Sequence, residues 1–548
     1  MAPVLSPNGE LHPLGGFARR QGVAIAQHAH AGFRPQLVVA GALAAVTALA
    51  VFLSQGDPLL SLVPLLLVGL SVLLWRAPLR VIASLTLFVG LALDADTNGT
   101  RDKWSYALEP LRVLFFENLK KVIPVEALKL SVLDLLVLLL VGLVVYRRAV
   151  GDRRDGHGVP TVSWLRLGLV LSLLGMVGML AWGLARGGVF QQAYWQLREP
   201  IYVPALALLF LACFKGPRDL GPVGAAVVLA AVYKSLVCIF FYQFIAREFN
   251  YKPPYVTSHT DSALFSVAVM IALIAWHEKL SWKVRLCLGA SVPVLLLGIY
   301  TNNRRLAWVE LAFSVMAAYA LTPRTFVKRA LTRLLVFAAV LAPLYLVVGW
   351  NSTSSIFRPV RTVRSVVDAD VDRSSLDREV ENYNLVVTLK TNPLLGTGLG
   401  HEYVEFTKGD DISTVFSQYR FIPHNSVLGI LAFGGVFFFT LFWLPLMMGM
   451  YLAVRSYRAA RTPLARTAAL SVVTALIAYE IQGWGDMGIQ SWATSFLAAA
   501  ALGVVAQLAP AVGAWPSRRA AVPSLASPEP FAPAALSPAA AGVGAEAP

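Results

Sequence analysis

Apolar stretches about as long as a membrane-spanning helix recur along most of the chain, with polar connections between them. They are continuously apolar, whereas the strands of a membrane barrel alternate lipid-facing and lumen-facing residues. Since only helices and closed barrels satisfy the backbone in lipid, the pattern predicts helices. We expect about 12–14 spans, near residues 36–54, 57–75, 78–94, 131–147, 164–185, 201–214, 221–243, 263–276, 284–300, 306–322, 332–350, 427–453, 467–483 and 489–508.

The composition agrees with a membrane protein. Of 548 residues, 57% are hydrophobic and 14% are charged, whereas about 25% are charged in soluble proteins. The predicted fold class is an all-α polytopic membrane protein. The cysteines, Cys213, Cys238 and Cys287, lie in apolar stretches without the spacing of a disulfide framework or a metal site. Neither a metal nor another cofactor is expected.

Positive charge is distributed asymmetrically between the two sides of the predicted bundle. Cytoplasmic connections of membrane proteins carry an excess of Lys and Arg, and alternate connections here are basic. If the span count is right, these connections lie on the same side as both termini, which are therefore expected in the cytoplasm. The net charge of +15 is mostly this topology signal, so nucleic acid is not an expected partner. The basic connections are at 76–80, 147–154, 215–218, 279–285, 324–333 and 455–466.

Polar segments divide the chain into five parts. Residues 1–35 are a cytoplasmic N-terminal segment without the apolar core of a cleavable signal peptide. Residues 36–350 hold the first eleven spans, and 426–508 hold the last three. Between them, 351–425 form a long outward-facing loop, and loops of this length are usually functional. Residues 509–548, rich in Ala, Pro and Ser, are expected to be a disordered cytoplasmic tail.

His424 is the principal catalytic candidate. It stands in RFIPHNSVLG, where the long loop meets an apolar helix, and only His259, His401 and His424 face outward on this topology. Pro423 predicts an extended approach, and Asn425 or Ser426 is expected to cap the helix. The helix N-terminus is expected to keep the imidazole neutral and able to accept a proton. A solvated loop histidine is the alternative.

Two adjacent arginines stand on the side of the membrane where basic residues are scarce. Arg304 and Arg305 open a predicted span in TNNRRLAWVE, on the outward side. They either anchor the helix to lipid head groups or form an anion site, because guanidinium binds phosphate with paired donors and keeps its charge. Arg198 supports an anion site in the same way, more weakly.

Three short motifs have simpler explanations than the ligand sites they suggest. DADTNG at 94–99 starts like a calcium loop, but Ser105 stands where the bidentate Glu belongs. DADVD at 368–372 suggests a metal–nucleotide sugar site, but lies on the side away from nucleotide sugars. GTGLG at 396–400 lacks the strand–turn–helix setting of a dinucleotide site and predicts a tight turn.

An enzyme on the outward face needs a donor that is already activated and delivered by the membrane. A glycan linked to a polyprenyl diphosphate meets both requirements. Arginines would stabilise the diphosphate as it leaves, and a histidine would take the proton of the attacking sugar hydroxyl. Glu381 is a candidate to orient that histidine. This chemistry needs no metal if arginines neutralise the leaving group.

The order of these motifs resembles the O-antigen ligase/O-antigen polymerase superfamily. Over residues of about 290–450, TNNRRLAWVELA opens a span, REVENYNLVVTLKTNPLLGTGLG lies in the long loop, and PHNSVLGILAFGGVFFF ends it. The family uses lipid-linked glycan donors on the periplasmic side. The resemblance implies that Arg304 or Arg305 is the span-opening arginine, Arg378 the loop arginine and His424 the loop-end histidine. Tyr383 stands where the family often has tryptophan.

The sequence therefore predicts a multi-pass glycosyltransferase of the bacterial inner membrane with a periplasmic active face. It would transfer a glycan from undecaprenyl diphosphate to a sugar hydroxyl of the lipid A core. Polymerisation of lipid-linked repeat units is the alternative, and a transporter or flippase is a further one. Expected partners are the lipid-linked glycan, an acceptor glycolipid or glycan, and membrane lipids. The expected catalytic residues are His424 and Arg378, and the expected substrate-binding residues are Arg304, Arg305, Arg198, Glu381 and Asn425.

Overall fold

The computed structural model is helical, and its described residues contain no β-strand. It describes residues 75–93, 131–150, 161–248, 256–324, 326–352, 354–357, 373–414 and 416–516, with a few short stretches elsewhere. The chain forms two units, Met1–Pro78 and Leu79–Pro548, and the second contains every element discussed below.

Seven helices in the described part of the chain are long and apolar enough to cross a membrane, and three shorter apolar segments accompany them. The protein is thus an all-α polytopic membrane protein. The seven are α6 (Ser163–Ala185), α7 (Phe190–Cys213), α8 (Leu220–Phe240), α11 (Trp282–Asn302), α16 (Ser426–Ala459), α17 (Pro463–Gly485) and α18 (Trp492–Ala511). The shorter ones are α3 (Leu79–Ala92), α10 (Asp261–His277) and Leu335–Gly349 within α13 (Phe326–Gly349).

The remaining elements are α5 (Val132–Ala149), α12 (Arg305–Leu321), α15 (Arg373–Thr391) and the short α9 (Ala246–Glu248), with single turns at Pro217–Asp219, Phe241–Ile245, Ser355–Phe357 and Gly488–Gln490. Each predicted span from 78–94 onward coincides with one helix, although α7 begins well before the expected 201. The span at 57–75 lies largely outside the described residues and the span at 36–54 lies partly outside them; DADTNG, DADVD and most of the predicted tail are also outside.

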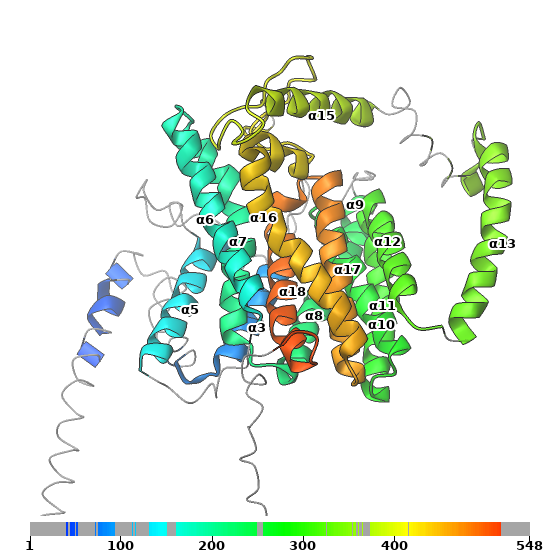
Figure 1. Ribbon diagram of the computed structural model, residues 1–548, viewed down its shortest axis with the longest axis horizontal. Coiled ribbons are helices and arrows are strands. Elements are labelled where there is room, and N and C mark those ends of the chain that lie inside the picture. The colour runs from blue at the N-terminus through cyan, green and yellow to red at the C-terminus, as the bar shows by residue number, and fades with distance from the viewer. Residues whose placement is uncertain are drawn as a thin grey trace, which may run out of the picture. The chain divides into compact units, whose positions relative to one another are not determined.

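Helix α18 forms the centre of the bundle. Its apolar window is completely buried, and it packs against α7, α16 and α17. Helix α17 also contacts α10 and α12, while α16 contacts α6. Figure 1 shows α15 lying across the end of the bundle where α16 begins. We call this the site end: α10, α12, α16 and α18 begin there, and α17 ends there.

The long polar segment docks on the bundle through a break in α16. Gly435 has φ 57° and ψ −174°, so the helix is interrupted there. The amides of Val436 and Phe437 donate to the carbonyls of Pro393 and Leu394 at 2.9 and 3.0 Å, and Gly398 N donates to Phe433 O at 2.8 Å. GTGLG is a turn, as predicted: Gly396, Gly398 and Gly400 all have positive φ. The break thus fixes the segment that follows α15.

Candidate functional site

His424 lies at the start of α16, directly against α15. Its backbone amide donates to Glu381 Oε2 at 2.9 Å, and its ring Nδ1 lies 3.3 Å from the same oxygen. Glu381 is buried, while the imidazole stays half-exposed. Glu381 therefore fixes both the backbone and the ring of His424, and leaves Nε2 as the nitrogen available to a substrate.

The predicted electrostatic effect on His424 was wrong. We expected the helix N-terminus to disfavour the protonated ring. Instead, the hydrogen bond with the Glu381 carboxylate raises the pKa of His424, although burial opposes the charged form. A carboxylate in contact outweighs the helix dipole because it carries a full charge at hydrogen-bond distance.

The entry of the chain into α16 is as the sequence predicts. The helix begins at Ser426, and Asn425 is its N-cap, with its side-chain oxygen accepting from Leu428 N at 3.1 Å. The Asn425 amide group also donates to Asn382 Oδ1 of α15 at 3.0 Å. Asn425 thus joins the two helices that meet at His424.

Arg378 lies one turn of α15 before Glu381. Its guanidinium donates to the carbonyl of Gly485 at the end of α17, at 2.9 Å. Its positive charge also acts on His424 and Asp486. Helix α15 therefore brings a cation and a carboxylate to His424 from one face, with Arg378 and Glu381 three residues apart.

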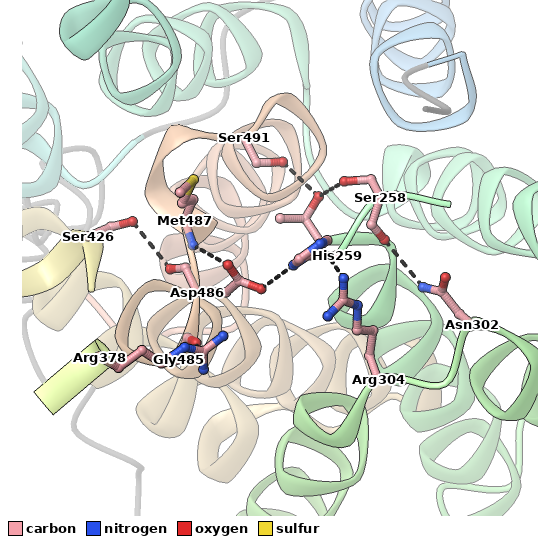
Figure 2. Close-up of polar contacts among 11 residues, drawn as sticks. Ser258, His259, Asn302, Arg304, Arg378, Ser426, Gly485, Asp486, Met487 and Ser491 are labelled. Atoms are coloured by element: carbon pink, nitrogen blue, oxygen red, sulfur yellow. Dashed lines mark hydrogen bonds and ion pairs between the residues drawn. The ribbon is translucent and has the colours of Figure 1, made fainter. Parts of the chain in front are cut away.

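Asp486, His259 and Arg304 form a connected row next to this group, which Figure 2 shows. His259 Nδ1 lies 2.5 Å from Asp486 Oδ2, and its Nε2 contacts the guanidinium of Arg304. Since a guanidinium only donates, Nε2 must offer its lone pair, and the Nδ1 hydrogen then points at Asp486. His259 thus links a carboxylate to an arginine.

Asp486 is held in its ionised form. Burial alone would raise the pKa of Asp486, but its hydrogen bond and electrostatic interaction with His259, the Met487 amide and the charge of Arg378 lower it to about 2. The Asp486 carbonyl accepts from Ser426 Oγ at 3.3 Å, one residue after the cap of α16. The end of α17 therefore contacts Arg378 through the Gly485 carbonyl and the start of α16 through the Asp486 carbonyl. It is also linked to Arg304, because His259 contacts both Asp486 and Arg304.

The segment that carries His259 is anchored on several sides. Asn302, at the end of α11, accepts from the amides of Val256 and Thr257 at 3.2 and 3.1 Å and donates to Ser258 O. Ser491 Oγ donates to Thr260 Oγ1 at 2.8 Å. Just after the segment, Asp261 forms a completely buried ion pair with Lys234 of α8 at 2.5 Å. These contacts hold His259 at a fixed place beside Arg304.

The three other candidate arginines differ in their position relative to this group: Arg304 belongs to it, whereas Arg305 and Arg198 do not. Arg304, the N-cap residue of α12, is half-buried, whereas the neighbouring Arg305 is exposed. Arg198 lies on α7 in a buried ion pair with Asp134 at 3.0 Å. Its guanidinium stands 4.8 Å from the ring centre of Trp492, which follows Ser491 in the chain. Arg198 is therefore near the His259 segment but already paired with a carboxylate.

Sequence reasoning did not bring His259 and Asp486 together. His259 was expected on the outward side, but neither residue belongs to a motif that pairs it with the other. Their contact depends on α10 packing against α17, which sequence spacing does not show. The one signal in the sequence was their position: His259 precedes an apolar stretch and Asp486 follows another, so both fall at the same end of the bundle.

Comparison with known proteins covers part of this cluster. Residues 290–443 match the family model described as O-antigen ligase. The match runs from α11 into α16 and contains Arg304, Arg305, Arg378, Glu381 and His424, but not His259 or Asp486. No curated protein gives a significant match.

Proposed function

We propose that this protein is a glycosyltransferase of the O-antigen ligase/polymerase type that transfers a glycan from undecaprenyl diphosphate to a sugar hydroxyl of the lipid A core. The match of residues 290–443 to the O-antigen ligase model supports a ligase/polymerase-type function in general. Donor, acceptor and membrane face are our inference. The observation that supports this proposal best is that four residues of the matched region meet at one end of the helix bundle: Arg304, Arg378, Glu381 and His424.

A glycosyl transfer needs a base for the acceptor hydroxyl and positive charge for the leaving diphosphate, and the site offers His424 for the first and two arginines for the second. The acceptor hydroxyl attacks the anomeric carbon, and its proton passes to Nε2 of His424. The bond between that carbon and the diphosphate oxygen breaks, and its electron pair leaves with the diphosphate. Arg378 and Arg304 stabilise the charge that develops there. Glu381 holds the imidazole through Nδ1 and stabilises the imidazolium that forms.

The charge environment decides among the candidate arginines. Arg304 contacts His259, which pairs with Asp486, and the charge of Arg378 acts on the same Asp486, so we assign Arg304 to the diphosphate. Arg305 is exposed on the side of α12 and suits a lipid head group. Arg198 was also predicted to bind substrate, but we give it a lesser role because Asp134 already balances its charge.

The distribution of basic residues supports a periplasmic site. The ends of the helices opposite the site end carry Lys279, Arg324, Arg458 and Arg466. By the positive-inside rule, that opposite end faces the cytoplasm. The site end then faces the periplasm of the inner membrane, where a lipid-linked donor is delivered. A reporter fused near residue 400 should accordingly give a periplasmic signal, and a cytoplasmic signal would contradict the proposed function.

The direct test is transfer by the purified protein from an undecaprenyl diphosphate-linked glycan. His424→Ala should insert normally and bind donor, yet transfer about a hundredfold to ten-thousandfold more slowly, the usual contribution of a general base. His401→Ala is the matched control, because His401 contacts the Gly183 carbonyl at 3.1 Å, away from the cluster. Activity should survive EDTA. Near wild-type turnover of His424→Ala would remove the histidine from the mechanism.

The acceptor is tested by the surface polysaccharide of a deletion strain. Loss of a ligase leaves bare core on the surface and full-length chains on the lipid carrier. Loss of a polymerase leaves core capped with a single repeat unit, which would change the acceptor while keeping the same chemistry. Unchanged polysaccharide with loss of transport of a small solute would favour the transporter.

A further inference from the structure

Glu310 is a carboxylic acid side chain that the proposed transfer reaction does not use. It lies on α12, about 8 Å along the helix from its first residue, Arg305, and is 0% exposed. Within the described part of the chain, neither of its carboxyl oxygens has a hydrogen-bond partner. A buried acid of this kind in a membrane bundle calls for a binding partner.

One hydroxyl group lies close to this carboxyl, and two others lie further along the same helix interface. Ser266 of α10 donates to the Ala307 carbonyl at 3.1 Å and lies within reach of the Glu310 carboxyl. Ser262 lies one turn earlier on α10, and Ser314 one turn later on α12. Both are buried, and their hydroxyl oxygens have no hydrogen-bond partner among the described residues. Helical spacing therefore places three hydroxyls and a carboxyl along the α10–α12 interface.

Positive side chains on the neighbouring elements are engaged elsewhere. Lys234 pairs with Asp261 at 2.5 Å, Arg304 contacts His259, and Arg466 pairs with Glu278 at 2.9 Å. Helix α17, which also packs on α12, contributes Glu480, another acid. An ionised carboxylate without a partner in an apolar medium would cost tens of kcal/mol by simple solvation estimates. Glu310 must therefore bind a small cation that neutralises it.

We propose that Glu310, with the hydroxyl of Ser266, forms a site for a small monovalent cation, a proton or Na⁺. Carboxylate, hydroxyl and carbonyl oxygens are the ligands that hard cations prefer. A bound proton makes Glu310 a neutral acid whose O–H donates to a hydroxyl or carbonyl oxygen. A bound Na⁺ is ligated by the same oxygens. Either occupant ties α12 to α10 close to Arg304, independently of glycan transfer.

Infrared difference spectroscopy of the purified protein in detergent tests the proton. Wild type minus Glu310→Gln should show the C=O band of a protonated carboxylic acid, which shifts in D₂O. Ser266→Ala should move this band without removing it, because a hydrogen-bond partner changes while the acid remains. Glu379→Gln is the matched control: Glu379 is exposed on α15 and should leave the band unchanged.

Thermal unfolding in NaCl and in choline chloride of equal ionic strength tests Na⁺. If Na⁺ is the occupant, it should stabilise wild type but not Glu310→Gln, and wild type should lack the protonated-acid band in NaCl. If a proton is the occupant, the band is present and the two salts act alike. Wild type with neither the band nor a specific Na⁺ effect would overturn the proposal, even if Glu310→Gln does not fold.

Discussion

Asp486 and Arg304 do not touch, yet each contacts a different nitrogen of the His259 ring. The Asp486 contact, at 2.5 Å, fixes the hydrogen on Nδ1, and this leaves the Nε2 lone pair for the guanidinium. The same end of α17 also holds Arg378 through the Gly485 carbonyl. Two arginines that come from distant parts of the sequence are thus positioned by one short segment.

Replacing Asp486 by Asn should slow transfer although Asp486 touches no substrate. A hydrogen bond to a charged group contributes about 1.5–3 kcal/mol, so we expect roughly a ten- to hundredfold loss. The measurement is a double-mutant cycle with Arg304→Ala. The two losses should be strongly non-additive if Asp486 acts through Arg304. Asp411→Asn, at an exposed aspartate of the long polar segment, should have little effect. Additive losses would separate Asp486 from Arg304.

The arginine doublet should respond asymmetrically. Arg304→Ala removes a donor aimed at the leaving diphosphate, which typically costs about a hundred- to thousandfold in rate. Arg305→Ala should stay near wild type, since its exposed side chain serves at most as a lipid anchor. Initial rates at matched expression in the membrane decide this. The reverse order would exchange the two roles, and full activity of both variants and of the double variant would make both residues lipid anchors.

Arg378→Lys should lose most of the activity while the protein still inserts. A guanidinium can donate to the Gly485 carbonyl and to a phosphate at once, whereas an ammonium lacks the planar fork. Kinetics over a range of donor concentrations should show the defect. Arg420→Lys is the control, because Arg420 pairs with Glu402 and Glu405 outside the cluster. An Arg378→Lys enzyme with wild-type kinetics would reduce Arg378 to a simple positive charge.

The pH profile should move when Glu381 is replaced. A general base works in its neutral form, so activity should rise as the pH increases through the raised pKa of His424. Glu381→Gln removes the carboxylate that raises this pKa. The midpoint of the rise should therefore move to lower pH, toward the ordinary histidine value of about 6.5, while the plateau falls because the ring is less well held. A midpoint that stays in place would mean that another group limits the profile.

The bundle could be predicted from hydropathy because lipid demands long apolar helices. Helix α15 could not be predicted in this way, because its buried face is mostly polar, with Leu385 as its buried apolar residue. Glu381, Asn384 and Thr388 point inward and bond to backbone groups of residues 404–407 and 424 rather than to an apolar core. The sequence marked Arg378, Glu381 and His424 as candidates, and the structure brings them together.

The row of Asp486, His259 and Arg304 shows the limit of sequence reasoning. Each residue stands at an end of a different helix, and only the packing of α10, α12 and α17 places them side by side. Sequence motifs predicted those features that depend only on neighbouring residues in the chain. Pro423 and Asn425 predicted the start of α16, whereas the sign of the shift at His424 depended on Glu381, which comes from another element.

The break in α16 provides the last prediction. At Gly435 the backbone has φ 57°, and an added Cβ would come within 2.4 Å of the Leu394 carbonyl group and 2.5 Å of Gly396 N. Leu394 O accepts from Phe437 N across the break, and Gly396 N donates to Asn392 O within the docked segment, so neither backbone group can move aside easily. Gly435→Ala should therefore destabilise the protein by more than about 1 kcal/mol. It should also lower transfer, because the docked segment follows directly after α15.

Thermal unfolding of purified variants in detergent measures this effect. Gly221→Ala is the matched control: it lies in α8 with nothing within 4 Å of the added Cβ, and alanine is the better helix former there. Gly221→Ala should be as stable as wild type or more so, and equally active. If Gly435→Ala matched it in both respects, the break in α16 would not be what holds the polar segment, and the placement of Arg378 and Glu381 would have to depend on contacts of α15 alone.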